Sequence, residues 1–145
     1  MASFGETLTM ANFVHGKKTV IKVDNSAGSL QDLSAYFNAT SLQRVQELLE
    51  TTCFGATAKT YIAGFPDAKI PIGGFWDATV DNHLAGILGV ENSSIELYPE
   101  GTASGMVKYT AEAILITYDF STGAHQASAW TGELQVTGAV TRAII

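Results

Sequence analysis

Alternation of apolar and polar residues with a period of two constrains the fold of this chain more than any other feature of its sequence. Within residues 132–141, Leu134, Val136 and Val140 fall on one side of an extended backbone. The other side is polar or small and consists of Glu133, Gln135, Thr137, Ala139 and Thr141. Because successive side chains of a strand point to opposite faces, the segment is predicted to be a strand with one face in the core.

Further short strands are predicted along the chain, separated by turns rich in Gly, Ser, Asn and Asp. We expect them at residues 19–25, 38–50, 69–77, 93–99, 106–120 and 125–142. The second of these also contains good helix formers, but the alternation of Thr40, Leu42 and Arg44 with smaller polar residues favours a strand. Residues 53–68, which are rich in Gly, Ala and Thr, are expected to form a long excursion without regular structure.

Two of the predicted strands depart from simple alternation. Gly73 and Gly74 interrupt one of them, which predicts a bulge or a close approach of another backbone. The strand at 106–120 is apolar on both sides towards its end, with Val107, Ala113 and Leu115 on one side and Ile114, Ile116, Tyr118 and Phe120 on the other. Its second apolar face therefore needs to be covered by a helix or by another subunit.

Helical periodicity occurs in one convincing segment, residues 78–89. Its apolar residues are Val80, Leu84, Ile87 and Leu88, which share one face of a helix. Asp77 is placed to cap the N-terminus, and Gly89 is placed to end the helix. The sequence thus predicts a mainly β, antiparallel domain with one flanking α-helix at about 78–88.

Composition restricts the kind of function. The chain of 145 residues is long enough for one domain with an ordinary core, without disulfides or metal. Only 15% of the residues are charged, against about 25% in a typical soluble domain, so a partner is expected to cover part of the surface. The net charge of -6 argues against a nucleic-acid binder, because affinity for phosphates comes from Lys and Arg.

Motifs for catalysis, metal binding and membrane insertion are absent from the sequence. There is no G-x-S-x-G, H-E-x-x-H or paired C-x-x-C pattern, and no signal peptide or apolar span of membrane length. His83 and Asp81 are interpreted as a solvated helix face, and Trp76 and Trp130 as core or interface residues. Cys53 is interpreted as a small apolar side chain that is buried or half-buried. We therefore expect a soluble protein that is not an enzyme and has no cofactor, metal or catalytic site.

Several stretches in order resemble a known family. They are the run LQDLSAYFNATSLQRVQELLETTCFGATAKTYIAGFPDAKIPIGGFWD, the turn YPEGTASG and the ending TGELQVTGAVTR. Together they are similar to the major tail tube protein of long-tailed bacteriophages and prophages, a family related to the tube protein of type VI secretion. The resemblance covers residues 19–142 and carries no catalytic signature.

The resemblance implies an architecture and an assembly. It implies that residues 1–145 form a single tail-tube domain, an antiparallel β-sandwich or half-barrel. Residues 1–18 would be an N-terminal arm, and residues 51–67 a long loop that reaches a neighbouring ring. Six copies would close a ring whose inner sheets join into a continuous lumen barrel, and stacked rings would form the conduit for DNA ejection.

The same resemblance assigns candidate residues to each contact. Candidates for the inter-ring loop are Thr52, Phe54, Gly55, Thr57, Lys59, Tyr61 and Phe65. Candidates for the lumen face are Glu133, Gln135 and Thr137, for which the resemblance implies a position either on the lumen or on the exterior of the tube. Candidates for the interface within a ring are Ile114, Ile116, Tyr118 and Phe120.

The implied partners are other copies of the chain and further tail components, namely the tail terminator, tape-measure and baseplate or tip proteins. DNA would pass through the lumen without specific binding, and no membrane is involved. The implied location is the virion tail, assembled in the host cytoplasm. An acidic lumen suits this task, because repulsion keeps the duplex mobile whereas attraction would add up over many rings.

Two other functions remain open on the sequence. The first is another ring-forming tail component, such as a tail terminator or head-tail connector, which would stop at one ring instead of forming filaments. The second is a small monomeric β-sandwich that binds a ligand through Trp76 or Trp130 in an open pocket.

Overall fold

The computed structural model describes residues 13–145 and shows a mainly β fold with one α-helix among them. The elements are η2 (Gly16–Lys18), β1 (Val20–Asp24), β2 (Leu30–Asp32), η3 (Ser34–Tyr36), β3 (Phe37–Thr40), β4 (Gln43–Glu50), β5 (Tyr61–Phe75), α1 (Ala78–Ile87), β6 (Ser93–Tyr98), β7 (Val107–Gly123) and β8 (Gln126–Ile144). The predicted fold class is confirmed. The expected N-terminal arm, 1–18, lies mostly outside the described residues.

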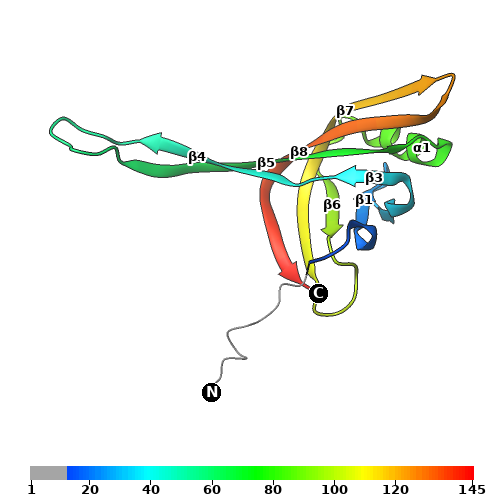
Figure 1. Ribbon diagram of the computed structural model, residues 1–145, viewed down its shortest axis with the longest axis horizontal. Coiled ribbons are helices and arrows are strands. Elements are labelled where there is room, and N and C mark those ends of the chain that lie inside the picture. Colours follow the sequence, from blue (N-terminus) through cyan, green and yellow to red (C-terminus); the bar gives the residue numbers. More distant parts are fainter. Residues whose placement is uncertain (1–12) are drawn as a thin grey trace, which may run out of the picture.

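All strands belong to one antiparallel sheet in the order β2-β1-β6-β7-β8-β5-β3, with β4 also paired to β5. The sheet bends into two layers because β7 and β8 are long enough to take part in both (Figure 1). In layer A, residues 107–113 of β7 and 136–144 of β8 continue β2, β1 and β6. In layer B, residues 114–123 of β7 and 126–135 of β8 continue into β5 and β3.

The core lies between the two layers and under α1. Its buried residues are Ile21, Val23, Ile95 and Leu97 from layer A, Ile70, Ile72, Trp130 and Leu134 from layer B, and Val80, Leu84 and Ile87 from α1. Leu134 and Val136 are buried as the alternating pattern predicts, whereas Glu133 and Gln135 lie on the opposite side. The interior of the bend is thus the apolar face of the sheet, and its outer surface is the polar face.

The two adjacent glycines of β5 lie where another backbone comes close, as expected. The register between β3 and β5 shifts between Phe37 and Ala39, opposite Gly74 and Gly73. A Cβ atom on Gly74 would collide with the carbonyl oxygen of Tyr36. This close approach lets the ring of Phe37 pack edge-on against Trp130, with 4.9 Å between ring centroids.

The helix α1 begins as predicted, because the carboxylate of Asp77 accepts a hydrogen bond from the backbone N–H of Thr79 at 2.8 Å. Gly89, with a φ of 78°, follows its C-terminus. Two details of the prediction are wrong. Leu88 lies after the helix and is 47% exposed, and His83 is buried against the sheet instead of lying on a solvated face. The helix ends at Ile87, so Val80, Leu84 and Ile87 cover the core, and the side chain of Leu88 beyond its end points outward.

The prediction of two uniform faces in β7 is also wrong. The register with β8 shifts between Leu115 and Thr117, so Ile116 is the extra residue of a bulge. Beyond the bulge the alternation changes phase, and Tyr118 and Phe120 lie on the same side as Trp130 while Ile114 faces away. The four residues proposed for a contact within the ring, Ile114, Ile116, Tyr118 and Phe120, therefore do not form one face.

Candidate assembly surfaces

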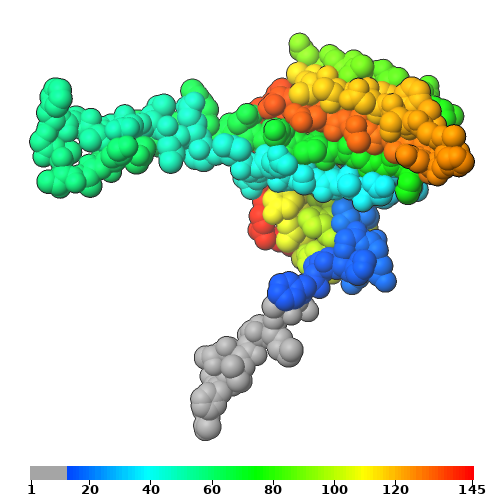
Figure 2. Space-filling model, turned by 45° about the horizontal axis from the view of Figure 1, so that its top comes forward, coloured from blue at the N-terminus to red at the C-terminus, as the bar shows by residue number. Residues whose placement is uncertain are grey.

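The most prominent feature of the surface is a two-stranded ribbon, residues 43–67. We call this ribbon the arm, and it is distinct from the N-terminal arm expected at residues 1–18. It consists of β4, the connecting loop 51–60 and the first part of β5, and it projects from the body as a narrow rod (Figures 1 and 2). The strand expected at 38–50 is confirmed, with a break between β3 and β4. The irregular excursion expected at 53–68 is wrong in its second half, which is strand from Tyr61 onward.

The arm keeps a defined shape through its pairing and one bulge. Gln46 pairs with Pro66 and Leu48 pairs with Ala63, so β5 carries one extra residue at this point. The side-chain amide of Gln46 donates to the carbonyl of Gly64 at 2.9 Å. A Cβ atom on Gly64 would meet the carboxylate of Glu47, so the exposed Glu47 side chain packs over this glycine and would have to move aside for a larger residue.

The loop at the tip of the arm is held by its own hydrogen bonds. The backbone N–H of Thr51 donates to the carbonyl of Thr60 at 2.8 Å, and the N–H of Thr60 donates to the hydroxyl of Thr52 at 3.0 Å. Gly55 has a φ of 84°, a conformation that glycine adopts readily. The structure therefore places five of the predicted loop residues, Thr52, Phe54, Gly55, Thr57 and Lys59, in this loop, and Tyr61 and Phe65 on the adjoining strand.

Exposed apolar side chains line the arm. Every residue of β4 is exposed, and the large exposed apolar side chains of the arm are Val45, Leu48, Leu49, Phe54, Tyr61, Ile62 and Phe65. Phe65 is 85% exposed and Ile62 is 55% exposed. A ribbon that can bury little apolar area by itself gains most from a partner that covers these side chains. The arm thus has the composition of an interface.

Layer B has two open edges within the described residues. Along β7, residues 114–123 pair with β8 on one side and make only one isolated bridge, from Leu88 to Leu115, on the other. At the opposite edge, β3 and β4 pair only with β5. Unpaired backbone groups along an edge favour pairing with another strand. The edge of β7 carries Ile116, which is 48% exposed.

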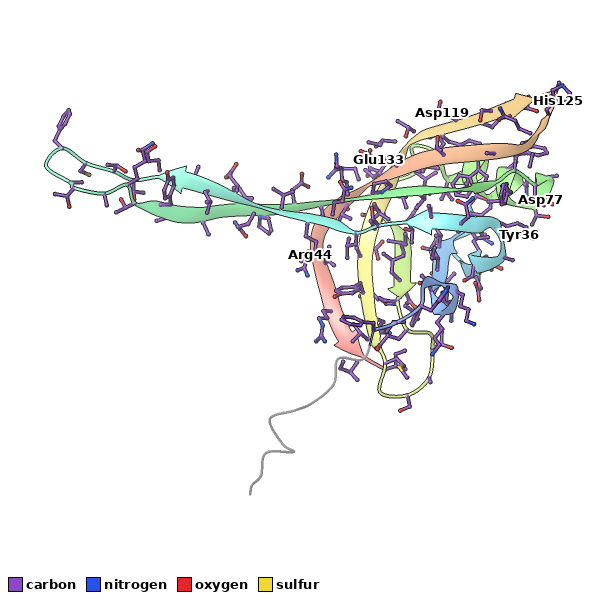
Figure 3. The ribbon with its side chains drawn as sticks, in the orientation of Figure 1. Tyr36, Arg44, Asp77, Asp119, His125 and Glu133 are labelled. Carbon is purple, nitrogen blue, oxygen red and sulfur yellow. The ribbon has the colours of Figure 1, made fainter. Side chains whose placement is uncertain are left out.

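The polar face of layer B is predominantly acidic. By register, Glu133 and Gln135 share this face with Asp119 and Lys69, and the side-chain amide of Gln135 donates to Asp67 at 2.8 Å. Three carboxylates and one ammonium group therefore lie on one side of this layer. Figure 3 shows Glu133 and Asp119 on the outside of the bend. Asp67 and Asp119 were not singled out by the sequence, because their face becomes evident only from the register.

The end of layer B remote from the arm carries a second apolar cluster. The rings of Trp76 and Phe120 lie 6.2 Å apart and are 38% and 62% exposed. Beneath them, the hydroxyl of Tyr118 donates to Asp81 at 2.7 Å, and burial together with this bond raises the pKa of Tyr118 to about 12. Asp77 lies at the same end (Figure 3). This cluster was not predicted as a unit.

The structure disfavours a ligand site built on Trp130. Trp130 is 1% exposed and packs in the core, so it has no face for a sugar or base to stack on. Cys53 is exposed in the loop of the arm, so the expectation of a buried or half-buried side chain is wrong. Among residues 13–145, no group of three or more His, Cys, Asp or Glu residues could hold a metal ion. No helix in the described part of the chain is long and apolar enough to cross a membrane.

No protein-family model matches the sequence, and no curated protein matches it either. Solved structures match the fold. The tail of an empty gene transfer agent particle, refined with C6 symmetry, is similar with a TM-score of 0.72 and 16% identity over 88% of this chain and 96% of that chain. The SPP1 tail tube is similar with a TM-score of 0.68 and 9% identity, over 89% of this chain and 78% of that chain.

A third similar structure is the sheath–tube complex of the extracellular contractile injection system PVC in its extended state. It gives a TM-score of 0.69 and 12% identity over 100% of both chains. All three are structural tail or tube assemblies and not enzymes. The fold of the chain is therefore that of tail tube proteins, which confirms at the level of fold the resemblance seen in the sequence.

Proposed function

We propose that the chain is a structural tail tube protein: six copies close a ring, and rings stack into the conduit through which DNA is ejected. The arm is the observation that carries the proposal, because an isolated domain gains nothing from a ribbon of exposed apolar residues. The similar tail of the gene transfer agent particle has C6 symmetry, which supports six copies here.

Ring closure is proposed to use the two open edges of layer B. The strands β7, β8, β5 and β3–β4 alternate in direction across this layer. When the edge of β7 in one copy meets the β3–β4 edge of the next, the two strands run antiparallel, so the pairing continues without a change of pattern. A contact between two different edges is heterologous, and it gives a closed ring when the rotation from one copy to the next closes. Ile114 and Ile116 remain candidates for this contact.

The lumen wall is proposed to be the polar face of layer B, with Glu133 and Gln135, and with Thr137 at the adjoining end of layer A, facing the passing duplex. The acidic balance of this face supports the proposal, because it repels phosphates and so avoids holding DNA in the tube. Closure of layer B into a barrel directs its apolar face outward, where layer A and α1 cover it. No ordered DNA contact is needed.

The arm, including the proposed inter-ring loop 51–67, is assigned to stacking between rings. In the virion tail, which we propose is assembled in the host cytoplasm, the two ends of the tube would contact other components. One end would meet a terminator and the other a baseplate or tip, and a tape-measure protein would occupy the lumen during assembly. Similarity to the PVC sheath/tube terminator structure supports contacts of the first kind.

Negative-stain electron microscopy of the purified protein tests the proposal. We expect rings and tubes at micromolar to millimolar concentration, and tubes lost but core intact when residues 53–58 are replaced by a two-residue turn. None of the buried core residues lies in this segment, so circular dichroism and the urea midpoint should stay unchanged. A compact monomer at every concentration contradicts the proposal. Growth that stops at single rings indicates a terminator instead.

A further inference from the structure

The apolar cluster of Trp76 and Phe120 has no role in the ring closure described above. It lies at the end of layer B remote from the arm, where Phe75, which precedes Trp76, is 59% exposed. Phe75 is also the last residue of β5, and the arm contains the first residues of the same strand. One strand therefore joins the two most apolar exposed regions of layer B, one at each end.

We propose that the cluster of Trp76 and Phe120 is the receiving site for the arm of a second copy, in the next ring of the stack. The inference rests on the proposed function and identifies the partner surface of the arm. The end of the arm where pairing stops offers Leu49 and Ile62, which pair across the ribbon and are 47% and 55% exposed. Aliphatic side chains against exposed aromatic rings exclude water from both.

Charge supports this choice of partner. The loop 51–60 contains Lys59 and no acidic residue, and the pair of Glu50 and Tyr61 separates it from Leu49 and Ile62. The receiving end contains Asp77 beside Trp76, and Figure 3 shows Asp77 at that end of the molecule. Asp119 precedes Phe120 in the chain but lies on the opposite, polar face of the strand. Head-to-tail contact brings Lys59 of the loop towards Asp77, whereas a contact between two loops would bring two Lys59 side chains together.

The length of β5 sets an upper limit to the distance between neighbouring rings. Ile62 and Phe75 are thirteen residues apart along β5. At about 3.3 Å per residue, a strand covers about 43 Å over this separation. If Ile62 of one copy meets the end of β5 in the next, the two copies are displaced by at most this length along the tube axis. Tilted strands shorten it, because only the axial component counts.

Cross-linking in assembled tubes tests the contact directly. In a Cys53→Ser background, Ala63→Cys in the arm is combined with Ser121→Cys next to Phe120, and a short bismaleimide is added. We expect a ladder of covalent multimers that continues beyond six copies, because the links run from ring to ring. The matched control combines Ala63→Cys with Ala103→Cys, an exposed position in the turn between β6 and β7, and should give no ladder.

Absence of the ladder, or an equal ladder in the control, overturns the receiving site. A ladder that ends at six copies also overturns it, because the links would then lie within one ring. The variant Phe120→Asp should give rings without tubes, whereas Leu30→Asp, at an exposed apolar position of β2, should still give tubes. Tubes from Phe120→Asp, or an axial repeat longer than about 43 Å, contradict the inference. If the wild-type chain forms no rings at all, it is the proposed function that fails.

Discussion

Charge reversal on the polar face of layer B is the most informative prediction about the lumen. The perturbation is Thr131→Lys combined with Glu133→Lys. Both positions lie on this face, where Thr131 pairs with Asp119 and Glu133 pairs with Pro71. Gln135 is left in place because its amide bonds Asp67 at 2.8 Å and the carbonyl of Ala68 at 3.0 Å. The core is untouched, so rings and tubes should assemble.

The magnitude follows from the side chains on this face. Asp67, Asp119, Glu133 and Lys69 carry a formal net charge of about -2 per copy, and the double variant changes it to about +1. In a ring of six, the belt changes from about -12 to about +6. Six neutralised phosphates correspond to a slope of about -5 for the logarithm of the binding constant against the logarithm of salt concentration.

The assay is cosedimentation of a short DNA duplex with assembled tubes at a series of salt concentrations. Wild-type tubes should bind no duplex, and the double variant should bind it with the salt dependence above. In virions with confirmed incorporation of the variant, DNA ejection should slow, and added salt should partly relieve the delay. The matched control is Glu91→Lys with Ser104→Lys, which adds the same charge at exposed turn positions. Equal binding by control and variant, or normal ejection by the variant, refutes a lumen position for this face.

Three further predictions concern stability. Burial lowers the pKa of His83, and its Nε2 has no hydrogen-bond partner among the described residues. The contribution of neutral His83 to the free energy of unfolding should be complete above about pH 6.5 and should be lost as the pH falls through the folded pKa. Urea midpoints at pH 7.5 and 5.5 should therefore differ less in His83→Gln than in the wild type. Gly74→Ala should cost about 1–3 kcal/mol, because its Cβ meets the carbonyl of Tyr36, and an unchanged melting temperature would contradict this contact. Tyr118→Phe should lower the free energy of unfolding by about 1 kcal/mol through loss of the bond to Asp81, and the Asp81→Asn variant provides the second side of a double-mutant cycle.

Local patterns predicted the elements that are governed by local chemistry. The alternation of Leu134 and Val136 with polar residues gave the correct buried face of β8. Asp77 caps α1 and Gly89 follows it, because capping depends on a few neighbouring residues. The predicted lumen residues Glu133 and Gln135 lie together on the polar face for the same reason. Their position in a lumen stays a prediction.

Features that depend on strand register were not predicted from the sequence. The bulge at Ile116 reverses the faces of Tyr118 and Phe120, and no residue type in β7 announces it. The second half of the arm resembles a loop in composition, with Gly64 and Pro66 inside a strand. This segment is a strand because it pairs with β4. A pattern read along the segment alone contains no information about that pairing.

The sequence by itself determined which residues alternate, where the helix begins and ends, and that the surface is poor in charge, because each of these depends on residues close together in the chain. Only the tertiary structure decided which edges stay open, which carboxylates share a face and that His83 is buried. These depend on contacts between residues far apart in sequence, such as Asp67 with Gln135. A slip of one residue in pairing would exchange the two faces of a strand, so assembly surfaces are defined by register as much as by composition.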